Sequence, residues 1–563
     1  MKRSMWFFGL LLAVAGLSSF RTADIAVSRP DRAQRRSLAK LERSYEYIRK
    51  MYVDSVDMAP LVEEAIRSMV QQLDPHTEYA SAAEMAEFWS LYRGKFGGIG
   101  IQTQWIRDSL VVTSLLSGGA AEEAGIRPDD RIVRVDGRTV KEIPASELIS
   151  VMRGDAGSKV KILVIRRGVC QPILYEIVRR EIPLPSVELA YRVDSAVGYI
   201  KLIRFGQTTM REVQRAYEEL DRPKELILDL RGNGGGLLDQ AIALSGFFLP
   251  KGSRIVSTEG RSVPSVVHSA RRNPVFPAEG RLIVLIDERS ASASEIVSGA
   301  LQDWDRAVIV GRRSFGKGLV QRQYLLPDGS ALRLVVARYH TPSGREIQRP
   351  YVKGGDRTAY RTHPLPDTIP SPAYRTLRTG RTVYGGGGIA PDVCVIQDTV
   401  QASYLNALLR KNIFPEFMQR YLDRNRTALE RDYPEFASFE ERFEVPDEMY
   451  EELIGLGLEQ GVTPPAEDSD VEAGTRRLLK ALLAERLFDR EALLRILHAR
   501  DDADFIRALN LLKNWEAERL FDREALLRIL HARDDADFIR ALNLLKNWEA
   551  EGLPLLEAQH ERQ

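Results

Sequence analysis

Short apolar runs alternate with helical patterns between Pro183 and Asp398, and this alternation limits the possible fold more than any other feature. Three of the runs, Ile227–Leu230, Leu282–Ile286 and Val308–Val310, are largely apolar, which is typical of strands buried on both faces of a parallel sheet. Helices must cover both faces of such a sheet. We therefore expect an α/β core over residues 171–400.

Other patterns flank this core and predict a multi-domain chain. Residues 34–93 show apolar positions at helical spacing, and residues 94–170 show short β-rich runs separated by glycine turns. Residues 401–563 are helical in pattern and highly charged. Within them residues 484–516 recur letter for letter as 517–549, each copy predicted to form two helices. Such perfect identity favours a recent duplication, or an error in assembling the sequence, over a working solenoid.

The composition excludes several classes of protein. The chain holds 80 Lys and Arg against 79 Asp and Glu, so it lacks the basic surplus of a nucleic-acid binder. Its two cysteines, Cys170 and Cys394, cannot form a disulfide framework and have no zinc-ligand spacing. With only seven histidines as well, we expect neither a metal nor another cofactor.

The first residues resemble an export signal. Lys2 and Arg3 precede an apolar run from Met5 to Leu17, which small residues follow. The run is shorter than the roughly 18 to 20 residues that a membrane-spanning helix needs. We expect residues 1–23 to act as a signal peptide or membrane anchor, and the protein to be exported to the periplasm or cell envelope, with membrane association through the N-terminus if the segment stays uncleaved.

A serine cluster follows one of the predicted core strands. Ser290-Ala291-Ser292-Ala293-Ser294-Glu295 comes after the strand Leu282–Ile286 and opens a helix. A serine in a strand-to-helix turn exposes its hydroxyl beside unpaired amides, which favour the negative charge of an acyl-transfer intermediate. The alternative is helix capping, which is common for serines in this position.

Two further elements accompany the cluster. Ser314–Gln321 places a lysine between two glycines, Gly316 and Gly318, although an ordinary surface lysine would also fit. Leu228–Gly236 is a strand running into a glycine-rich loop that can aim backbone amides at a carbonyl oxygen. A phosphate cradle is the rival interpretation, but the loop lacks the Lys-Ser/Thr ending of a P-loop and the spacing of a dinucleotide fingerprint.

Together the three elements resemble the carboxyl-terminal processing, or tail-specific, proteases of peptidase family S41. Other segments match motifs of the same family in the same order. These are Leu73-Asp74-Pro75-His76-Thr77-Glu78-Tyr79, Thr341-Pro342-Ser343-Gly344-Arg345-Glu346-Ile347-Gln348 and Gly385-Gly386-Gly387-Gly388-Ile389-Ala390-Pro391-Asp392. The resemblance covers about residues 35 to 400, and several independent motifs agree. It implies a crotonase-like (ClpP/crotonase) α/β core.

The resemblance implies a Ser-Lys dyad with a glutamine beyond the lysine. By position the nucleophile is Ser292, the base Lys317 and the helper Gln321, which would share a helix face with Lys317 if that stretch is helical. Ser290 and Ser294 remain candidates if the register differs.

The oxyanion donors would be the amides of Ala293 and Gly235. The family often has proline where this chain has Gly234, so the choice of loop amide stays open. Histidine-based catalysis through His76, His268 or His340 is the second candidate chemistry.

The lysine base makes a physical demand on its surroundings. An ammonium group cannot accept a proton from serine, so Lys317 must be neutral when it acts. A base working near neutral pH needs a pKa of roughly 7 to 8, well below the usual lysine value of about 10.4. Desolvation is the usual means, so we expect Lys317 to be buried and without a carboxylate partner.

The β-rich region resembles a PDZ domain placed ahead of the protease core. Phe96-Gly97-Gly98-Ile99-Gly100-Ile101 precedes a strand, and two short helices are predicted over Ala120–Ala124 and Ser146–Arg153. Such domains add the free C-terminus of a peptide as a strand and hold its carboxylate with loop amides.

The PDZ resemblance implies particular binding residues. Amides of Gly98, Ile99 and Gly100 would hold the carboxylate, and Ile101 would line an apolar pocket. Arg153, at a helix end, is our candidate for a link between the PDZ domain and the protease. Glycines that only shape a tight turn are the alternative.

We therefore expect an exported serine endopeptidase that recognises unstructured C-terminal tails of proteins through its PDZ domain and cleaves peptide bonds through an acyl-enzyme. The alternatives are a non-catalytic PDZ adaptor and an assembly protein of the cell envelope. A homodimer through the helical terminal regions is a further expectation.

Overall fold

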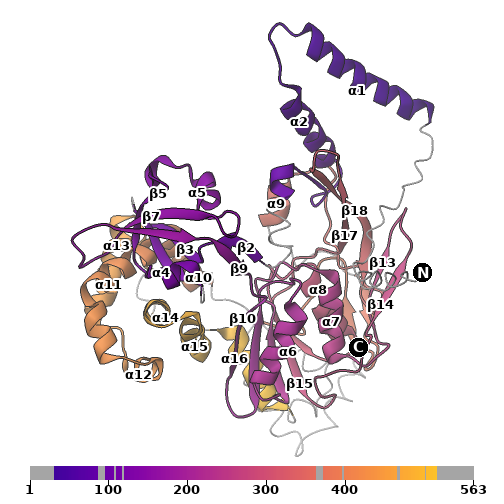
Figure 1. Cartoon of the computed structure of the whole chain (residues 1–563). Coiled ribbons are helices and arrows are strands. Elements are labelled where there is room, and N and C mark those ends of the chain that lie inside the picture. Colours follow the sequence, from indigo (N-terminus) through magenta and orange to yellow (C-terminus); the bar gives the residue numbers. More distant parts are fainter. Residues whose placement is uncertain are drawn as a thin grey trace, which may run out of the picture. The chain divides into compact units, whose positions relative to one another are not determined.

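The computed structural model describes residues 31–85, 95–106, 109–116, 119–362, 372–395, 399–465, 469–500 and 502–515 (Figure 1). The chain divides into two units, residues 1–69 and 70–563. The predicted export signal and the second repeat copy lie outside the described residues. Among the helices that are described, none has both the length and the apolar character needed to cross a bilayer.

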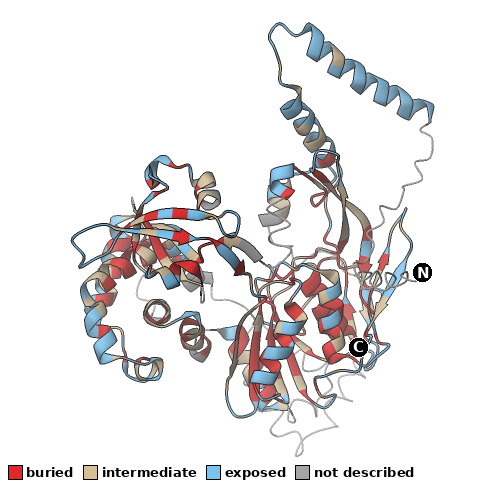
Figure 2. Ribbon diagram, in the orientation of Figure 1, coloured by how far each residue is buried: buried red, intermediate tan, exposed pale blue. Residues whose placement is uncertain are grey.

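The first unit contains α1 (Arg32–Met51) and most of α2 (Met58–Gln71). Asp31 begins α1 through a capping box with Gln34, which satisfies two backbone donors that a helix end leaves unpaired. No residue of α1 is buried, and the helix is almost wholly pale blue in Figure 2. Its apolar stripe, Leu38 to Ile48 at helical spacing, is therefore exposed.

A mixed sheet forms the centre of the second unit. Its order is β10-β11-β12-β15-β16-β21, with β10 antiparallel to β11 and all later pairs parallel. The strands span Val187–Arg192, Val197–Leu202, Glu225–Asp229, Arg281–Ile286, Val308–Gly311 and Val393–Cys394. The three apolar runs singled out in the sequence are the strands β12, β15 and β16, which confirms the predicted parallel arrangement.

Both faces of this sheet are covered, as alternate residues of one strand show. On β12, Leu228 packs with α6 (Thr209–Glu219), α7 (Leu238–Phe248) and α8 (Ala293–Asp303). Its neighbour Ile227 faces the opposite side and packs in one cluster with the C-terminal helices. Figure 2 shows the resulting band of buried strands.

The C-terminal region is helical, as predicted. Its helices are α10 (Thr399–Arg410), α11 (Ile413–Asp432), α12 (Phe436–Arg442), α13 (Asp447–Glu459), α14 (Ser469–Leu487), α15 (Arg490–Arg500) and α16 (Ala503–Lys513). Phe505 and Leu512 of α16 are buried in the cluster that includes Ile227 of the sheet. The first repeat copy therefore completes the core of the α/β sheet instead of extending away from it.

A second, antiparallel sheet follows the order β1-β18-β13-β14, with β17 also paired to β18. Its strands are β1 (Glu78–Ala80), β13 (Arg254–Glu259), β14 (Val266–Ser269), β17 (Leu319–Leu325) and β18 (Ala331–His340). β1 lies in the region predicted to be helical, because Glu78–Ala80 pairs with β18. The remaining short elements are α9 (Arg357–Thr362), β19 (Ala373–Arg375) and β20 (Thr382–Tyr384).

The β-rich region forms its own sheet in the order β3-β4-β5-β7-β8, with β6 beside β5. Its elements are β3 (Ile101–Ile106), β4 (Ser109–Leu115), α4 (Ala120–Ala124), β5 (Arg131–Val135), β6 (Arg138–Thr139), η1 (Val140–Glu142), α5 (Ala145–Met152), β7 (Lys159–Ile165) and β8 (Ile173–Val178). A ribbon of β2 (Lys95–Gly98) and β9 (Arg180–Pro183) connects it to the core strands. β3 is an edge strand, so its outer side is open to pairing within the described sheet.

Candidate active site

Three loops meet at one edge of the central sheet. Parallel strands place their carboxyl ends on the same edge, so the segments that follow β12, β15 and β16 are neighbours. The segment after β12 is the glycine loop, the one after β15 is the serine cluster, and the one after β16 leads to Lys317. The three elements that stood out separately in the sequence therefore lie together.

Ser292 differs from the other two serines of the cluster. It caps α8 with φ = 55° and ψ = −108° and is half-buried. Residues other than glycine rarely adopt positive φ, and such backbone strain concentrates at functional sites. Ser290 and Ser294 are fully buried, and their hydroxyls donate to the carbonyls of Leu230 and Asn233 at 2.8 and 2.9 Å. The geometry thus favours Ser292 as the reactive hydroxyl.

The carboxylate of Glu295 joins the serine turn to the lysine loop. Its Oε2 accepts the backbone amides of Ser292 and Lys317, both at 2.8 Å. Its Oε1 accepts the amide of Gly316 at 2.7 Å and the hydroxyl of Ser314 at 2.6 Å. Burial raises the pKa of Glu295, although these four donors oppose the rise. Two segments that are distant in sequence are therefore held by one side chain.

The role of Glu295 was missed in the sequence, although a signal for it exists. Ser292 and Glu295 form the pattern Ser-x-x-Glu, in which a glutamate at the third helical position returns to the amide of the capping residue. That pattern predicts the contact with Ser292 but says nothing about Lys317.

Gln321 fixes the amine of Lys317. The Lys317 Nζ donates to the Gln321 Oε1 at 2.9 Å, while the Gln321 Nε2 donates to the carbonyl of His76 at 2.7 Å. The second bond determines which end of the amide faces the lysine. A neutral amine that donates one N–H to Gln321 keeps its lone pair for another partner.

Two expectations about this pair need correction. Gln321 lies in strand β17 and not on a helix, because Leu319–Leu325 pairs along β18. Lys317 lies in the loop before that strand and is half-buried, not fully buried. The flanking glycines are closely packed, because a Cβ would lie 2.9 Å from the Cβ of Arg349 at Gly316 and 2.7 Å from the amide nitrogen of Gln348 at Gly318.

The glycine loop packs directly against the serine turn. Gly235 has φ = +98°, and a Cβ there would lie 2.8 Å from the Cβ of Ser292 and 2.9 Å from the amide nitrogen of Ala293. The Gly235 amide donates to the Asn233 side chain at 2.9 Å. Within the described part of the chain, the amides of Gly234 and Ala293 have no protein acceptor. The amides of Ala293 and Gly234 are therefore available to an acceptor, as is that of Gly236, whereas Gly235 would first have to release Asn233.

The three histidine alternatives lie in or beside the antiparallel sheet. His76 is buried, and its Nε2 lies 3.2 Å from the hydroxyl of Tyr360. His268 on β14 and His340 at the end of β18 lie on either side of β13, where they pair with the neighbouring residues Val256 and Ser257. Among the described residues no three His, Cys, Asp or Glu side chains converge as metal ligands would.

The predicted peptide-binding residues lie at the junction of β2 and β3. Gly98, Ile99 and Gly100 are buried, and Ile101 begins the edge strand β3. Gly100 has φ = +82°, and its missing Cβ leaves room for Gly119, whose Cα would otherwise lie 2.9 Å away. The turn therefore requires glycine at this position.

Arg153 is half-buried and directly follows α5. The next residue, Gly154, donates its amide to the carbonyl of Gly97 on β2 at 3.2 Å. The end of α5 is thereby joined to the strand that leads into the Gly98–Gly100 turn. This places Arg153 beside the connection between the two sheets.

The arrangement has the parts needed for acyl transfer. The hydroxyl of a residue with strained backbone at a helix N-terminus, an amine oriented by an amide, and backbone amides without a protein acceptor lie on loops at one sheet edge.

Comparison with known proteins gives a consistent result. Residues 196–355 match peptidase family S41 and residues 111–166 match a PDZ domain. Residues 11–83 match the N-terminal domain of the activating protease CtpB, and residues 404–489 match a family of unknown function.

The matches to individual relatives span most of the length of each relative. The carboxy-terminal-processing protease of Bartonella bacilliformis is 40% identical over 319 residues, which are 56% of this chain and 73% of the relative. The carboxy-terminal processing protease CtpA of Bacillus subtilis is 32% identical over 68% of this chain and 83% of its own. The solved photosystem II D1 C-terminal processing protease is 31% identical, covers 55% of this chain and 84% of its own, and has a TM-score of 0.35.

Proposed function

This chain belongs to peptidase family S41, as a carboxy-terminal processing serine protease with a PDZ domain, and we propose from this premise that Ser292 and Lys317 form its catalytic dyad. Neutral Lys317 removes the proton of the Ser292 hydroxyl as the oxygen attacks the carbonyl carbon of the substrate peptide bond. The amides of Ala293 and one residue of the glycine loop stabilise the oxyanion that develops.

The same two residues complete the reaction. When the tetrahedral intermediate collapses, the protonated lysine gives its proton to the departing amine, and the acyl group remains as an ester on Ser292. Lys317 is then neutral again and removes a proton from a water molecule, whose oxygen attacks the ester carbonyl. Collapse of this second intermediate releases the new C-terminus, and the serine oxygen recovers its proton from the lysine.

One observation carries this proposal. Among the three serines of the cluster, only Ser292 combines positive φ with incomplete burial, and its amide shares the Glu295 carboxylate with the amide of Lys317. The two reacting residues are therefore positioned by a common group. Gln321, which accepts the lysine N–H, acts as the helper that orients the amine.

The test is covalent labelling combined with substitution. A fluorophosphonate probe should modify Ser292, as found by mapping the labelled peptide, and Ser292→Ala and Lys317→Ala should each reduce peptide cleavage by roughly three orders of magnitude or more. Both variants should still bind a tail peptide. Labelling at Ser290 or Ser294 would contradict the assignment, and normal cleavage by Ser292→Ala would favour a different nucleophile.

The PDZ domain supports recognition of protein C-termini. We propose that the tail adds to the open edge of β3 and that the Gly98–Gly100 turn holds its carboxylate, with Ile101 in the apolar pocket. A peptide with an amidated C-terminus should then bind at least tenfold more weakly than the free acid, because it lacks the charge that the turn amides would bind. Equal affinity for both would exclude this mode.

Three further features belong to the same proposal. The basic head and apolar run of residues 1–23 support export to the periplasm or cell envelope, with or without cleavage of the segment. The parallel sheet with helices on both faces supports a crotonase-like core. The exposed apolar stripe of α1 supports a homodimer. The alternatives are a non-catalytic PDZ adaptor and an assembly protein of the cell envelope. Either would be favoured if the Ser292→Ala variant kept the physiological effect of the wild-type protein.

A further inference from the structure

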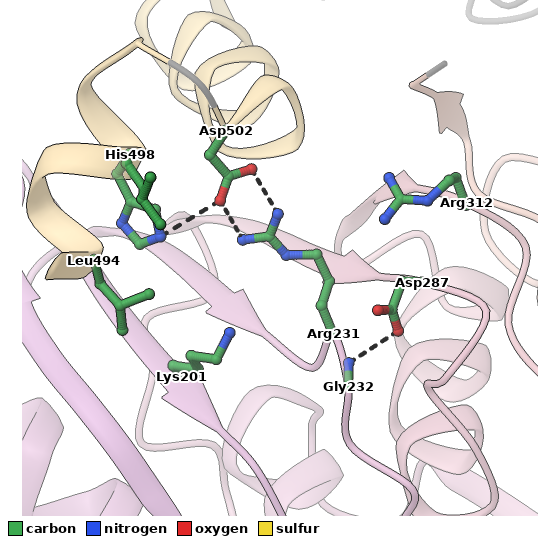
Figure 3. A pocket seen from close by; sticks show the side chains of 9 residues that line it. Lys201, Arg231, Gly232, Asp287, Arg312, Leu494, His498 and Asp502 are labelled. Atoms are coloured by element: carbon green, nitrogen blue, oxygen red, sulfur yellow. Dashed lines mark hydrogen bonds and ion pairs between the residues drawn. The ribbon is translucent and has the colours of Figure 1, made fainter. Parts of the chain in front are cut away.

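Arg231 is at the start of the glycine loop and forms an ion pair with a residue of the C-terminal helical region. Its guanidinium pairs with Asp502 through two bonds, Nη1 to Oδ1 at 2.5 Å and Nη2 to Oδ2 at 2.6 Å (Figure 3). On its other side Arg231 pairs with Asp229, the last residue of β12, at 2.6 Å. Only 14% of the arginine side chain is exposed. A bidentate pair of this kind fixes orientation as well as charge.

A second carboxylate of the repeat extends the contact. Asp504 lies 3.1 Å from Nη1 of Arg231 and 2.9 Å from Nη1 of Arg312. Arg312 follows β16, at the start of the loop that carries Lys317. The N-terminus of α16 thus reaches the ends of two core strands, and both lead into active-site loops.

Backbone contacts carry the position of Arg231 to the serine turn. The carbonyl of Leu230, just before Arg231, accepts the Ser290 hydroxyl at 2.8 Å, and the amide of Gly232, just after it, donates to Asp287 at 2.9 Å. Directly after Gly232, the carbonyl of Asn233 accepts the amide of Ala291 at 3.0 Å. A displaced arginine would therefore move the loop whose amides face Ser292.

Aromatic packing holds α16 against the central sheet. The ring of Phe505 stacks on His498 with centroids 4.4 Å apart and meets Tyr199 of β11 edge-on at 5.5 Å. Asp502 also caps α16 by accepting the amide of Phe505 at 3.0 Å. The carboxylate that holds Arg231 is thus itself held by the helix that it begins.

We propose that Asp502, which lies outside the matched peptidase segment, is a positioning residue for catalysis: through Arg231 it sets the glycine loop that binds the oxyanion. This inference rests on the proposed function of Ser292 and the loop amides. Burial acts against a charged guanidinium, but Asp229 and Asp502 raise the pKa of Arg231 well above its usual value. The two carboxylates therefore favour the charged form of the arginine against its burial.

The exact repeat determines how the test must be designed. Asp535 of the second copy occupies the position that Asp502 has in the first. Because the copies are identical, a substitution in one copy leaves an identical segment able to replace it. The informative variant is therefore Asp502→Asn combined with Asp535→Asn, and Asp535→Asn alone is its control.

Asparagine is chosen because it separates the two roles of Asp502. It is as good a helix cap as aspartate, so the start of α16 is preserved while the charged pair with Arg231 is lost. We expect kcat for a tail peptide to fall roughly tenfold or more, with KM within about twofold, because a misplaced oxyanion loop weakens transition-state binding more than substrate binding. The Asp535→Asn control should match the wild type.

A second control tests for a merely structural effect. Glu225, at the opposite end of β12, pairs with Arg281 at 2.9 Å, and Arg281 also donates to the carbonyl of Leu512 in α16 at 3.2 Å. Glu225→Gln therefore weakens the same helix interface away from the glycine loop. It should lower the unfolding temperature but leave kcat unchanged.

Each result decides the question. An unchanged kcat in the folded Asp502→Asn/Asp535→Asn variant overturns the inference, as does an equal loss of kcat in Glu225→Gln. If the Asp502→Asn/Asp535→Asn variant is unfolded, Asp504→Asn combined with Asp537→Asn is tested in its place, because it removes the weaker contact to Arg231. We expect this second variant to lower kcat a few-fold. An unchanged kcat would overturn the inference. Failure of the fluorophosphonate probe to label wild-type Ser292 would instead refute the proposed function itself.

Discussion

The backbone amide of Lys317 donates to the carboxylate of Glu295 across 2.8 Å, although the two residues are 22 positions apart. Because the same oxygen of Glu295 accepts the amide of Ser292, the lysine loop cannot move without disturbing the serine turn. The proposed nucleophile and base are thus coupled through a buried group that takes no part in bond making. This arrangement leads to the first prediction.

Glu295→Gln should nearly abolish cleavage and destabilise the fold. The amide nitrogen of glutamine would face backbone N–H groups, leaving buried donors without acceptors. We expect the free energy of unfolding to fall by roughly 2 kcal/mol or more, measured by urea unfolding. Glu346→Gln is the matched control, because Glu346 pairs with Arg338 at the surface and its loss should change neither quantity. A fully active Glu295→Gln variant would contradict this account.

Gln321→Glu should move the pH profile of cleavage to higher pH. It would place a carboxylate where an amide oxygen now lies 2.9 Å from the Lys317 Nζ, and an adjacent anion favours the protonated ammonium. More alkaline conditions are then needed to generate the neutral amine. Gln321→Ala, which adds no charge, should lower kcat without the alkaline shift. The pH dependence of kcat measures both, and identical profiles for the two variants would exclude the effect.

Arg153→Ala should reduce the cleavage of tail-bearing substrates several-fold. Arg153 lies between α5 and Gly154, whose amide is bonded to β2 at Gly97, so it is placed to couple the PDZ domain to the core. Arg138→Ala is the control, because Arg138 pairs with Glu147 of α5 at the surface. Steady-state cleavage and peptide affinity should both be measured. If neither changes in Arg153→Ala, the proposed link is lost.

The docked repeat should lose stability in acid. Burial lowers the pKa of His498 to about 4 from an ordinary value of 6.5. Between these values the unfolded chain binds a proton that the folded chain does not, so stability falls as the pH drops through this window, by about 3 kcal/mol in full. The titratable groups around the ring are Tyr191, Tyr199, Asp502, Arg231, Asp229 and Lys201.

Substituting His498→Gln together with His531→Gln, its counterpart in the second copy, should flatten this pH dependence. Arg231 holds the pKa of Asp502 below its usual value despite burial, so protonation of Asp502 also lowers the stability of the protein as the pH falls. Part of the slope should therefore remain. Urea unfolding between pH 7 and 4 measures the difference. An unchanged slope would show that His498 does not contribute.

Local pattern predicted much of the fold. α4 begins and ends at the predicted residues, Ala120–Ala124, because the turns that flank it are local properties. The first repeat copy contains α15 and α16, in agreement with the two predicted helices, and Asp489 accepts the amide of Ala492 at the start of α15. The strand containing Gln321 was not predicted, because Leu319–Leu325 is ordered by its pairing with β18 and its own pattern is ambiguous between helix and strand.

The sequence by itself determined the candidate groups and their order in the chain: a serine at the start of a helix, a lysine between glycines, and a glycine loop after a buried strand. Only the tertiary structure decided which serine is strained, that Glu295 joins two loops, and that Arg231 meets Asp502 from 271 residues away. Local propensities act over a few residues. Contacts between distant segments form only when the sheet brings its strand ends to one edge. The periodicity of the sequence therefore does not predict them.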